Sequence, residues 1–248
     1  MLARRSWIAG AIATAATAAD SPWTIVRRPD DATLIADLSA GEGVLAAVAG
    51  PKALLSLDEG VNWTSPNLPD RASSIFALSP ADLWLVGAEG LWHSTDAGAG
   101  WKRRLDQTGL ERVYFLNPEH GFACGAGRTI LESADGGESW KRVAAADEPD
   151  TAAAYTVYHW IHFVTPRAGI ITGTSRPPRR GNTGVLPAWR DPLAHVRRRE
   201  WPGASITLET RDAGGVWKHS TTSLFGRISR VRYSRDGHGL AVVEFHDA

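Results

Sequence analysis

The segment Ser94-Thr95-Asp96-Ala97-Gly98-Ala99-Gly100-Trp101 is one of four copies of an eight-residue pattern, Ser/Thr-x-Asp-x-Gly-x-x-Trp. The other copies occupy residues 56–63, 133–140 and 210–217. The four aspartates are 38, 39 and 77 residues apart along the chain. A motif that recurs at a period of about 40 residues indicates a repeat architecture, in which each interval forms one supersecondary unit.

Each fixed position of the pattern has a physical role in a tight turn. The aspartate can accept hydrogen bonds from backbone N–H groups of its own turn, and the Ser or Thr hydroxyl can add another. The glycine supplies a positive φ, and the tryptophan ring can cover apolar surface while its N–H reaches a partner. We therefore interpret the aspartates as structural rather than catalytic. The structural set is Ser56, Asp58, Gly60, Trp63, Ser94, Asp96, Gly98, Trp101, Ser133, Asp135, Gly137, Trp140, Thr210, Asp212, Gly214 and Trp217.

The residues between the copies read as short strands joined by polar turns. An apolar strand ends in a turn such as 115–121, a second apolar strand closes on glycine, a third enters the pattern and a fourth follows the tryptophan. Four strands of five or six residues account for one interval. This organisation predicts an all-β protein, a β-propeller of four-stranded antiparallel blades. We expect complete blades at about 33–66, 72–105, 110–144 and 156–221, and a partial blade at 227–248.

The pattern resembles the Asp-box, or BNR repeat, of β-propellers. The Trp-Lys that ends three copies, and the turns Phe115–Gly121 and Phe163–Gly169, resemble in particular the photosystem II stability/assembly factor-like propellers. The resemblance covers about residues 23–245 and implies an exported, non-catalytic scaffold that binds a protein partner. It transfers no functional residue, because the matching positions are the structural ones.

The 77-residue interval is either two periods with a degenerate blade or one blade with an insertion, and we favour an insertion at 175–203. Seven arginines against two acids give this segment a net charge of about +5. Meander topology places it, with the acidic stretch 144–156, on the face opposite the repeated turns, where loops on a rigid scaffold bind ligands. The candidate binding residues are Arg176, Arg179, Arg180, Trp189, Arg190, Arg197, Arg198, Arg199 and Trp201. The alternative is a solvated basic loop without a ligand.

An enzyme of the sialidase type, or another carbohydrate-active or carbohydrate-binding propeller, is the alternative function. Sialidase chemistry needs three arginines that bind the substrate carboxylate, a tyrosine nucleophile paired with a glutamate, and an aspartic acid that acts as the general acid. The best match to its first arginine motif, Val26-Arg27-Arg28-Pro29, lacks the aromatic and the isoleucine. No tyrosine in the sequence stands beside a clear glutamate partner. We assign no catalytic residue and expect no cofactor or metal.

The remaining expectations concern export, partners and the chain ends. Residues 1–19 resemble a signal peptide with an arginine pair, which predicts a periplasmic or extracellular protein by the Tat or Sec route. Lysine plus arginine equals aspartate plus glutamate at 27 each, so no nucleic-acid partner is expected, and no apolar stretch is long enough for a membrane span. Cys124 is expected to be a buried apolar residue. Because no fifth copy of the pattern occurs, we expect either a C-terminally truncated propeller or a five-bladed ring with one incomplete sheet, to which Trp23–Arg27 could add an outer strand.

Overall fold

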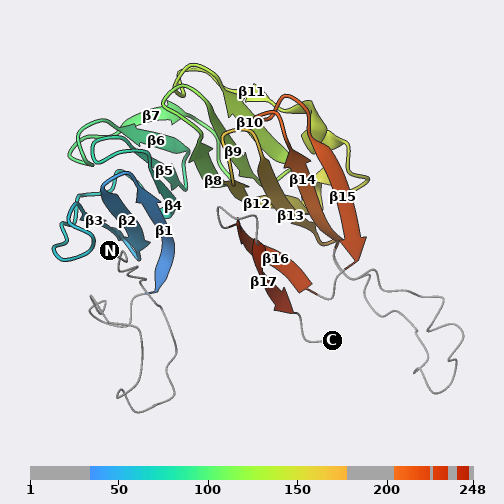
Figure 1. Cartoon of the computed structure of the whole chain (residues 1–248), viewed down its shortest axis with the longest axis horizontal. Helices are drawn as coiled ribbons and strands as arrows, with labels where there is room; N and C mark the ends of the chain where they lie inside the picture. Colours follow the sequence, from blue (N-terminus) through green and yellow to red (C-terminus); the bar gives the residue numbers. More distant parts are fainter. Residues whose placement is uncertain (1–33, 178–203, 224–225, 234–238, 246–248) are drawn as a thin grey trace, which may run out of the picture. The chain divides into compact units, whose positions relative to one another are not determined.

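The computed structural model describes residues 34–177, 204–223, 226–233 and 239–245, and these form antiparallel sheets in chain order (Figure 1). The first sheet contains β1 (Ile35–Gly41), β2 (Val44–Ala49) and β3 (Lys52–Ser56). The second contains β4 (Ala72–Ala77), β5 (Leu83–Gly87), β6 (Leu91–Ser94) and β7 (Lys102–Leu105). The third contains β8 (Leu110–Phe115), β9 (Gly121–Gly125), β10 (Thr129–Ser133) and β11 (Lys141–Arg142). The fourth contains β12 (Thr156–Phe163), β13 (Gly169–Ser175), β14 (Ala204–Thr210) and β15 (Lys218–Ser223), and the last contains β16 (Gly226–Tyr233) and β17 (Gly239–Phe245).

The prediction of an all-β protein built from four-stranded antiparallel sheets is confirmed. In the first sheet the place of the fourth strand is taken by a single bridge, in which the Leu55 N–H donates to Thr64 O at 2.9 Å. The chain divides into two compact units. The first comprises residues up to Phe122 together with Glu132–Lys141, and the second comprises Ala123–Leu131 and the residues from Arg142 onward.

The second strand of each complete sheet is a continuous apolar run because it is covered on both faces. All five residues of β5 and of β9 are buried, and so are the first five residues of β13. In the first unit, β2, β4 and β5 contribute to one apolar cluster that includes Val44, Ile75 and Leu85. Short apolar runs of this kind are typical of strands in the core of stacked sheets.

The repeated turn is held by its own Ser and Asp side chains. In residues 94–101, Ser94 Oγ donates to Asp96 Oδ1 at 2.8 Å and accepts from the Gly98 N–H at 2.8 Å, while Asp96 Oδ1 accepts from the Gly100 N–H at 2.8 Å. The same three bonds occur in residues 56–63, 133–140 and 210–217, with lengths of 2.7–2.9 Å. We name these four segments the repeat turns.

Two consecutive residues of each repeat turn adopt a left-handed backbone, not only the glycine that the pattern predicts. The residue after the aspartate has φ of 59° at Ala97, 62° at Ala213 and 60° at Glu59, where a side chain is strained. In the third repeat turn, residues 133–140, the following glycine is also approached closely by a side chain of the preceding sheet. A Cβ on Gly137 would overlap the Trp84 indole, so this position requires glycine for space as well as for φ.

In the first unit, side chains of β1 cover the free edge of β4. Asp37 Oδ2 accepts from Ser74 Oγ at 2.7 Å and from the Ile75 N–H at 3.1 Å, and Ser39 Oγ accepts from the Ala77 N–H at 3.0 Å. Asp37 also meets Arg112 of β8 at 2.9 Å. Because unpaired strand edges invite association, these bonds protect an edge that the sheet itself leaves open.

In the second unit a strand edge is also covered by side chains, which here are a histidine and a tryptophan. His159 Nε2 lies 2.7 Å from Ile228 O, and Trp160 Nε1 donates to Val231 O at 2.9 Å, so β12 covers the edge of β16. A one-residue bulge interrupts β1, β4, β12 and β16 near their first residues. Beyond β16, Leu240 and Val242 of β17 are 72% and 48% exposed. The expected outer strand Trp23–Arg27 lies outside the described residues.

Candidate functional site

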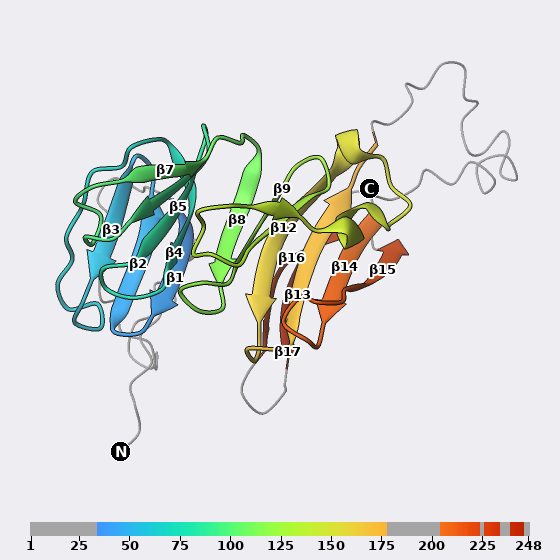
Figure 2. The same cartoon turned by 90° about the horizontal axis from the view of Figure 1, so that it is seen from above.

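The fourth sheet separates its repeat turn from the predicted insertion. Its register pairs Gly169 with Thr210 at the end that carries the repeat turn, and Ser175 with Thr156 and Ala204 at the other end. The two views agree that β12 to β15 lie side by side in this order (Figures 1 and 2). The chain therefore leaves β13 for residues 176–203 at the end opposite the repeat turn.

The connection between the third and fourth sheets reaches β12 at this same end. It contains the 3-10 helices η2 (Ala144–Asp147) and η3 (Ala153–Tyr155), and we name residues 144–155 the rim loop. Arg142 binds Asp147 through two parallel bonds, Nε to Oδ2 at 3.1 Å and Nη2 to Oδ1 at 3.0 Å. Its Nη2 also donates to Arg128 O at 3.0 Å. A bidentate arginine–carboxylate pair of this kind fixes orientation as well as distance.

A second arginine holds the loop from the β9–β10 turn. Arg128, with φ of 57°, donates from Nη1 to Asp147 O at 3.3 Å and to Pro149 O at 3.4 Å. Below the loop, Tyr158 donates its buried hydroxyl to Ala146 O at 2.9 Å. The rim loop is thus tied to the sheet at Ala146, Asp147 and Pro149, which favours one conformation.

The charges of this cluster stabilise the position of the rim loop. The hydrogen bond from Arg142 lowers the pKa of Asp147, and the bond to Asp147 raises the pKa of Arg142. Burial raises the pKa of Tyr158. At neutral pH Asp147 is therefore ionised and Tyr158 is neutral, which suits the ion pair with Arg142 and the hydrogen bond that the phenol donates to Ala146 O.

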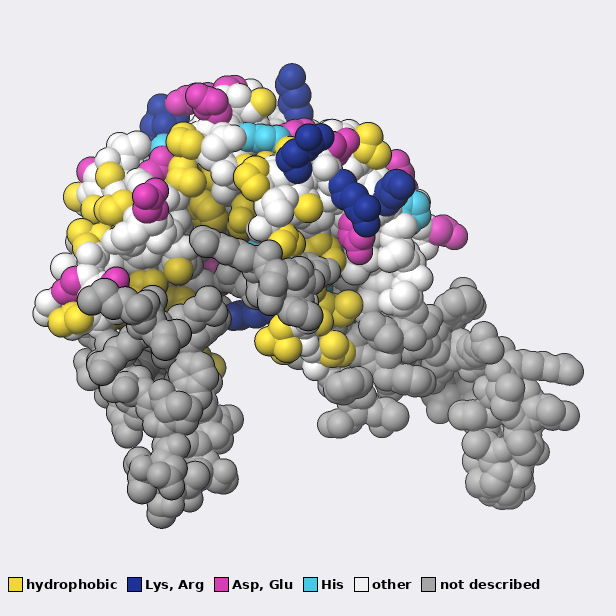
Figure 3. All heavy atoms as spheres, in the orientation of Figure 1, with side chains coloured by type: hydrophobic (Ala, Val, Ile, Leu, Met, Phe, Trp, Pro, Cys, Tyr) yellow, Lys and Arg dark blue, Asp and Glu magenta, His cyan; other side chains and the backbone are white. Residues whose placement is uncertain are grey.

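Charges of both signs are interspersed over this part of the molecule. His219 Nδ1 of β15 lies 3.2 Å from Glu148 Oε2, and Figure 3 shows histidine, acidic and basic side chains side by side over β15. Tyr155 is 42% exposed at the end of the rim loop, and its carbonyl accepts from the Arg176 N–H at 2.9 Å. Arg176 is thereby placed beside the rim loop. The other predicted binding residues, Arg179, Arg180, Trp189, Arg190, Arg197, Arg198, Arg199 and Trp201, lie outside the described residues.

A second cluster, in the first unit, was not identified from the sequence. His93 Nε2 lies 3.0 Å from Asp82 Oδ1, and the imidazole stacks on Trp84 with ring centres 4.0 Å apart. Arg104 Nη2, which can only donate, lies 3.3 Å from His93 Nδ1. Nδ1 is therefore the acceptor, and Nε2 carries the proton that is donated to Asp82.

The third sheet repeats this cluster with the acid and the histidine exchanged. Counted from the start of the second strand, His120 occupies the position of Asp82, and Phe122 that of Trp84. Counted from the repeat turn, Glu132 occupies the position of His93. His120 Nε2 lies 2.7 Å from Glu132 Oε1, and the imidazole packs against Phe122 at 4.9 Å. Both sheets keep the acid–histidine pair, although the acid and the histidine exchange positions. We therefore interpret the pair as a structural contact that stabilises the strands beside the repeat turn.

The aspartates of the repeat turns are occupied by their own turns. Backbone and side-chain hydrogen bonds from Asn62 lower the pKa of Asp58, and those from Ser139 lower the pKa of Asp135 to about 2. Within the described ranges, no group of three His, Cys, Asp or Glu side chains is placed to hold a metal ion. A helix with the length and apolarity of a membrane span does not occur among the residues that the structure describes.

Comparisons with known proteins place this chain among propellers without assigning a family. No protein-family profile matches the sequence. An alignment of 79 residues is 35% identical to the photosystem II assembly protein Ycf48 of Synechococcus sp. (strain JA-2-3B'a(2-13)), and it spans 28% of this chain and 24% of that protein. The chain thus spans about a quarter of this curated relative.

Two solved structures resemble the fold at low sequence identity. The GH74 xyloglucanase from Xanthomonas campestris superimposes with a TM-score of 0.52 at 14% identity, over 87% of this chain and 45% of that one. The extracellular domain of a putative hybrid two-component system from B. thetaiotaomicron gives a TM-score of 0.56 at 9% identity, over 88% and 28%. At these identities the likeness concerns the fold alone.

Proposed function

We propose that this chain is an exported, non-catalytic β-propeller that binds a protein partner through the face opposite the repeat turns. The observation that carries the proposal is the rim loop, an exposed segment held in one conformation by Arg128 and Arg142. A loop that is ordered before binding loses less conformational entropy when a partner docks. Arg176 adds a cation beside it, next to the arginine-rich segment 175–203.

The sequence likeness to Ycf48 supports the same proposal. That protein is named as an assembly protein, and a scaffold role needs surfaces rather than reacting groups. On the described part of the candidate face, Asp147, Tyr158 and Glu148 all serve contacts that position the loop. We further propose that the four repeat turns are Asp-box, or BNR, repeats that lock the blades.

A carbohydrate-active or carbohydrate-binding propeller is the second candidate, because the GH74 xyloglucanase carries an enzyme activity on a similar fold. The two candidates differ in what the purified chain does alone. Release of reducing ends from xyloglucan, or of a fluorophore from a sialoside, would support the enzyme and contradict the scaffold. No turnover is expected.

Site-specific photocrosslinking tests the scaffold proposal directly. A benzoylphenylalanine at Tyr155, in the rim loop, is compared with one at Val216, which is 60% exposed in the fourth repeat turn. Both positions are exposed and belong to the second unit, so the pair forms a matched control. We expect a discrete protein adduct in the native cell envelope from position 155 and none from position 216.

Charge reversal provides an independent arm. Replacing Arg197, Arg198 and Arg199 with Glu should abolish the adduct from position 155 if the basic segment contributes to binding. Adducts of equal yield from both positions, or none from position 155, would contradict the assignment of this face.

A further inference from the structure

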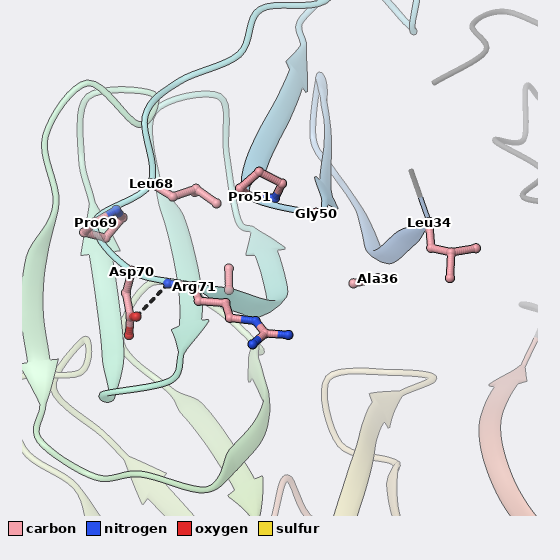
Figure 4. A pocket seen from close by; sticks show the side chains of 9 residues that line it. Leu34, Ala36, Gly50, Pro51, Leu68, Pro69, Asp70 and Arg71 are labelled. Carbon is pink, nitrogen blue, oxygen red and sulfur yellow. Dashed lines mark hydrogen bonds between the residues drawn. The ribbon is translucent and has the colours of Figure 1, made fainter. Parts of the chain in front are cut away.

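A groove of about 670 Å³ opens in the first unit (Figure 4). It lies between the first residues of β1, the turn Gly50–Pro51 that joins β2 to β3, and the connection that enters β4 at Ala72. This volume falls in the range of sites that enclose a side chain or a small ligand, about 300–1,000 Å³. The groove is therefore large enough for a side chain of a partner and part of its backbone.

The wall of the groove is mostly apolar and open to solvent. Leu34 is 84% exposed, Pro51 is exposed and Leu68 is half-buried. In Figure 4 the side chains of Leu68 and Pro51 lie on one side of the groove, and Ala36 lies across from them. Exposed apolar surface of this kind, with a charged group at its border, is typical of a binding site.

The charged group is Arg71, whose guanidinium makes no hydrogen bond or ion pair with another described residue. The adjacent Asp70 forms no ion pair with this guanidinium; its Oδ1 accepts from the Arg71 N–H at 2.6 Å and its Oδ2 from the Glu89 N–H at 2.7 Å. Figure 4 shows the carboxylate of Asp70 and the guanidinium of Arg71 pointing in different directions. Glu89 does not pair with Arg71 either, because its carboxylate forms an ion pair with Arg103 at 3.6 Å.

The backbone beside the groove favours an extended occupant. The register between β1 and β2 shifts from Ile35–Ala49 to Asp37–Val48, so Ala36 is the extra residue of a bulge. A bulged residue interrupts the regular ladder at the edge of the sheet. An extended peptide can pair with backbone groups at a sheet edge while its side chains enter adjacent sites.

We propose that this groove binds an extended acidic segment of the protein partner, with an apolar side chain against Leu68 and Pro51 and a carboxylate on Arg71. The guanidinium fork suits a carboxylate, and the groove offers apolar surface next to it. The proposal rests on the partner-binding function given above and specifies the chemistry of the partner. Binding should weaken as salt concentration rises, because the ion pair lies at an exposed border.

The test uses a fluorescein-labelled eight-residue peptide of alternating leucine and glutamate, measured by fluorescence anisotropy against the full chain. We expect Arg71→Glu to weaken binding by about 5- to 30-fold, because it removes an exposed ion pair and adds a repulsion of similar size, and Arg71→Lys to restore binding in part. Lys102→Glu, an equal charge change at an exposed position of β7, is the control and should change affinity less than about twofold.

Two further peptides separate the contributions. Glutamine in place of glutamate should weaken binding as Arg71→Glu does, and serine in place of leucine should weaken it even when Arg71 is intact. No binding by the wild-type chain, or equal effects of Arg71→Glu and Lys102→Glu, would overturn the proposal. A benzoylphenylalanine at Leu68 that crosslinks only to residues 1–33 of the same chain would also overturn it, since the groove would then be occupied internally.

These outcomes are distinguishable from failure of the scaffold function. If partner adducts from position 155 persist in the Arg71→Glu variant while the peptide does not bind the wild-type chain, the scaffold proposal stands and the groove assignment is wrong. If the peptide binds at Arg71 but no adduct forms at position 155, the partner uses the groove instead of the rim loop.

Discussion

Replacing Asp37 with Asn removes a buried carboxylate that joins β1, β4 and β8. The side chain of Asp37 is 2% exposed, and that of its partner Arg112 is 12% exposed. The carboxylate accepts from Ser74 Oγ, from the Ile75 N–H and from Arg112 Nη1, at 2.7, 3.1 and 2.9 Å. An amide keeps the volume but presents an NH₂ group to donors, so at least one of these bonds is lost.

The expected loss in free energy of unfolding is about 3 kcal/mol. A hydrogen bond to a charged group contributes about 1.5–3 kcal/mol, and removing one partner of a buried pair costs about 3–5 kcal/mol. The lower end of the second range applies because the amide oxygen retains part of the bonding. Urea denaturation followed by tryptophan fluorescence measures the effect, with an unchanged m-value as the sign that only stability has changed.

Asp106→Asn is the matched control, because Asp106 is 80% exposed and meets Arg103 at 3.5 Å. An exposed pair of this kind contributes about 0–1 kcal/mol. A double-mutant cycle with Arg112→Gln should give a coupling energy above about 1 kcal/mol with Asp37→Asn. A loss below about 1 kcal/mol for Asp37→Asn would refute the view that this carboxylate joins the three strands.

Three smaller predictions concern the turns. Gly137→Ala should lower the free energy of unfolding by about 3 kcal/mol or more, because the methyl group overlaps the neighbouring indole and the backbone is strained at φ of 81°. Gly127→Ala, at φ of 71° with its nearest atom 4.0 Å away, should lower it by about 1 kcal/mol in the same denaturation assay. Ala97→Gly should stabilise by up to about 1 kcal/mol, because it relieves the strain at φ of 59°, and a loss would contradict that explanation. Hydrogen bonds from Ser139 hold the folded pKa of Asp135 at about 2, below its ordinary 3.8. The contribution of this carboxylate to folding stability is therefore complete above about pH 4 and is lost as the pH falls toward 2. Tm values measured by calorimetry for Asp135→Asn should lack this pH dependence.

The sequence predicted the strands well because their pattern is local. The partial blade expected at 227–248 corresponds to the strand pair β16 and β17, which spans Gly226 to Phe245. Continuous apolar runs also predicted the second strands, since a strand covered on both faces carries no polar side. The all-β class followed from these runs and from the repeat period.

The contacts that join one sheet to the next were not predictable from local pattern. Asp37 meets Ser74 and Arg112 across separations of 37 and 75 residues, and a lone aspartate in an apolar strand does not specify its partners. The exchange of acid and histidine between the second and third sheets hid that cluster, because a search for identical residues at a fixed period does not find it. Aligning the strand positions and allowing either order of the pair would have found it.

The contacts that hold the rim loop in the candidate site were likewise not predictable from local sequence pattern. Acidic residues in 144–156 were expected on the face opposite the repeat turns, but nothing in the sequence pairs Asp147 with both Arg128 and Arg142. Only the pairing of β9 with β10 brings the turn at Arg128 to the loop. The predicted basic residues from Arg179 to Trp201 lie outside the described residues, so the proposal for that segment remains a prediction.

At β4 and at β16, the side chains that cover the strand edge precede that edge in the chain. Asp37 and Ser39 come before β4, and His159 and Trp160 come before β16. A ribosome releases the N-terminal residues first, so each cover is available before the edge that needs it leaves the exit tunnel. The order of translation therefore spares these two sheets a period with an open edge, and a circular permutant that begins between a cover and its edge would lose this advantage.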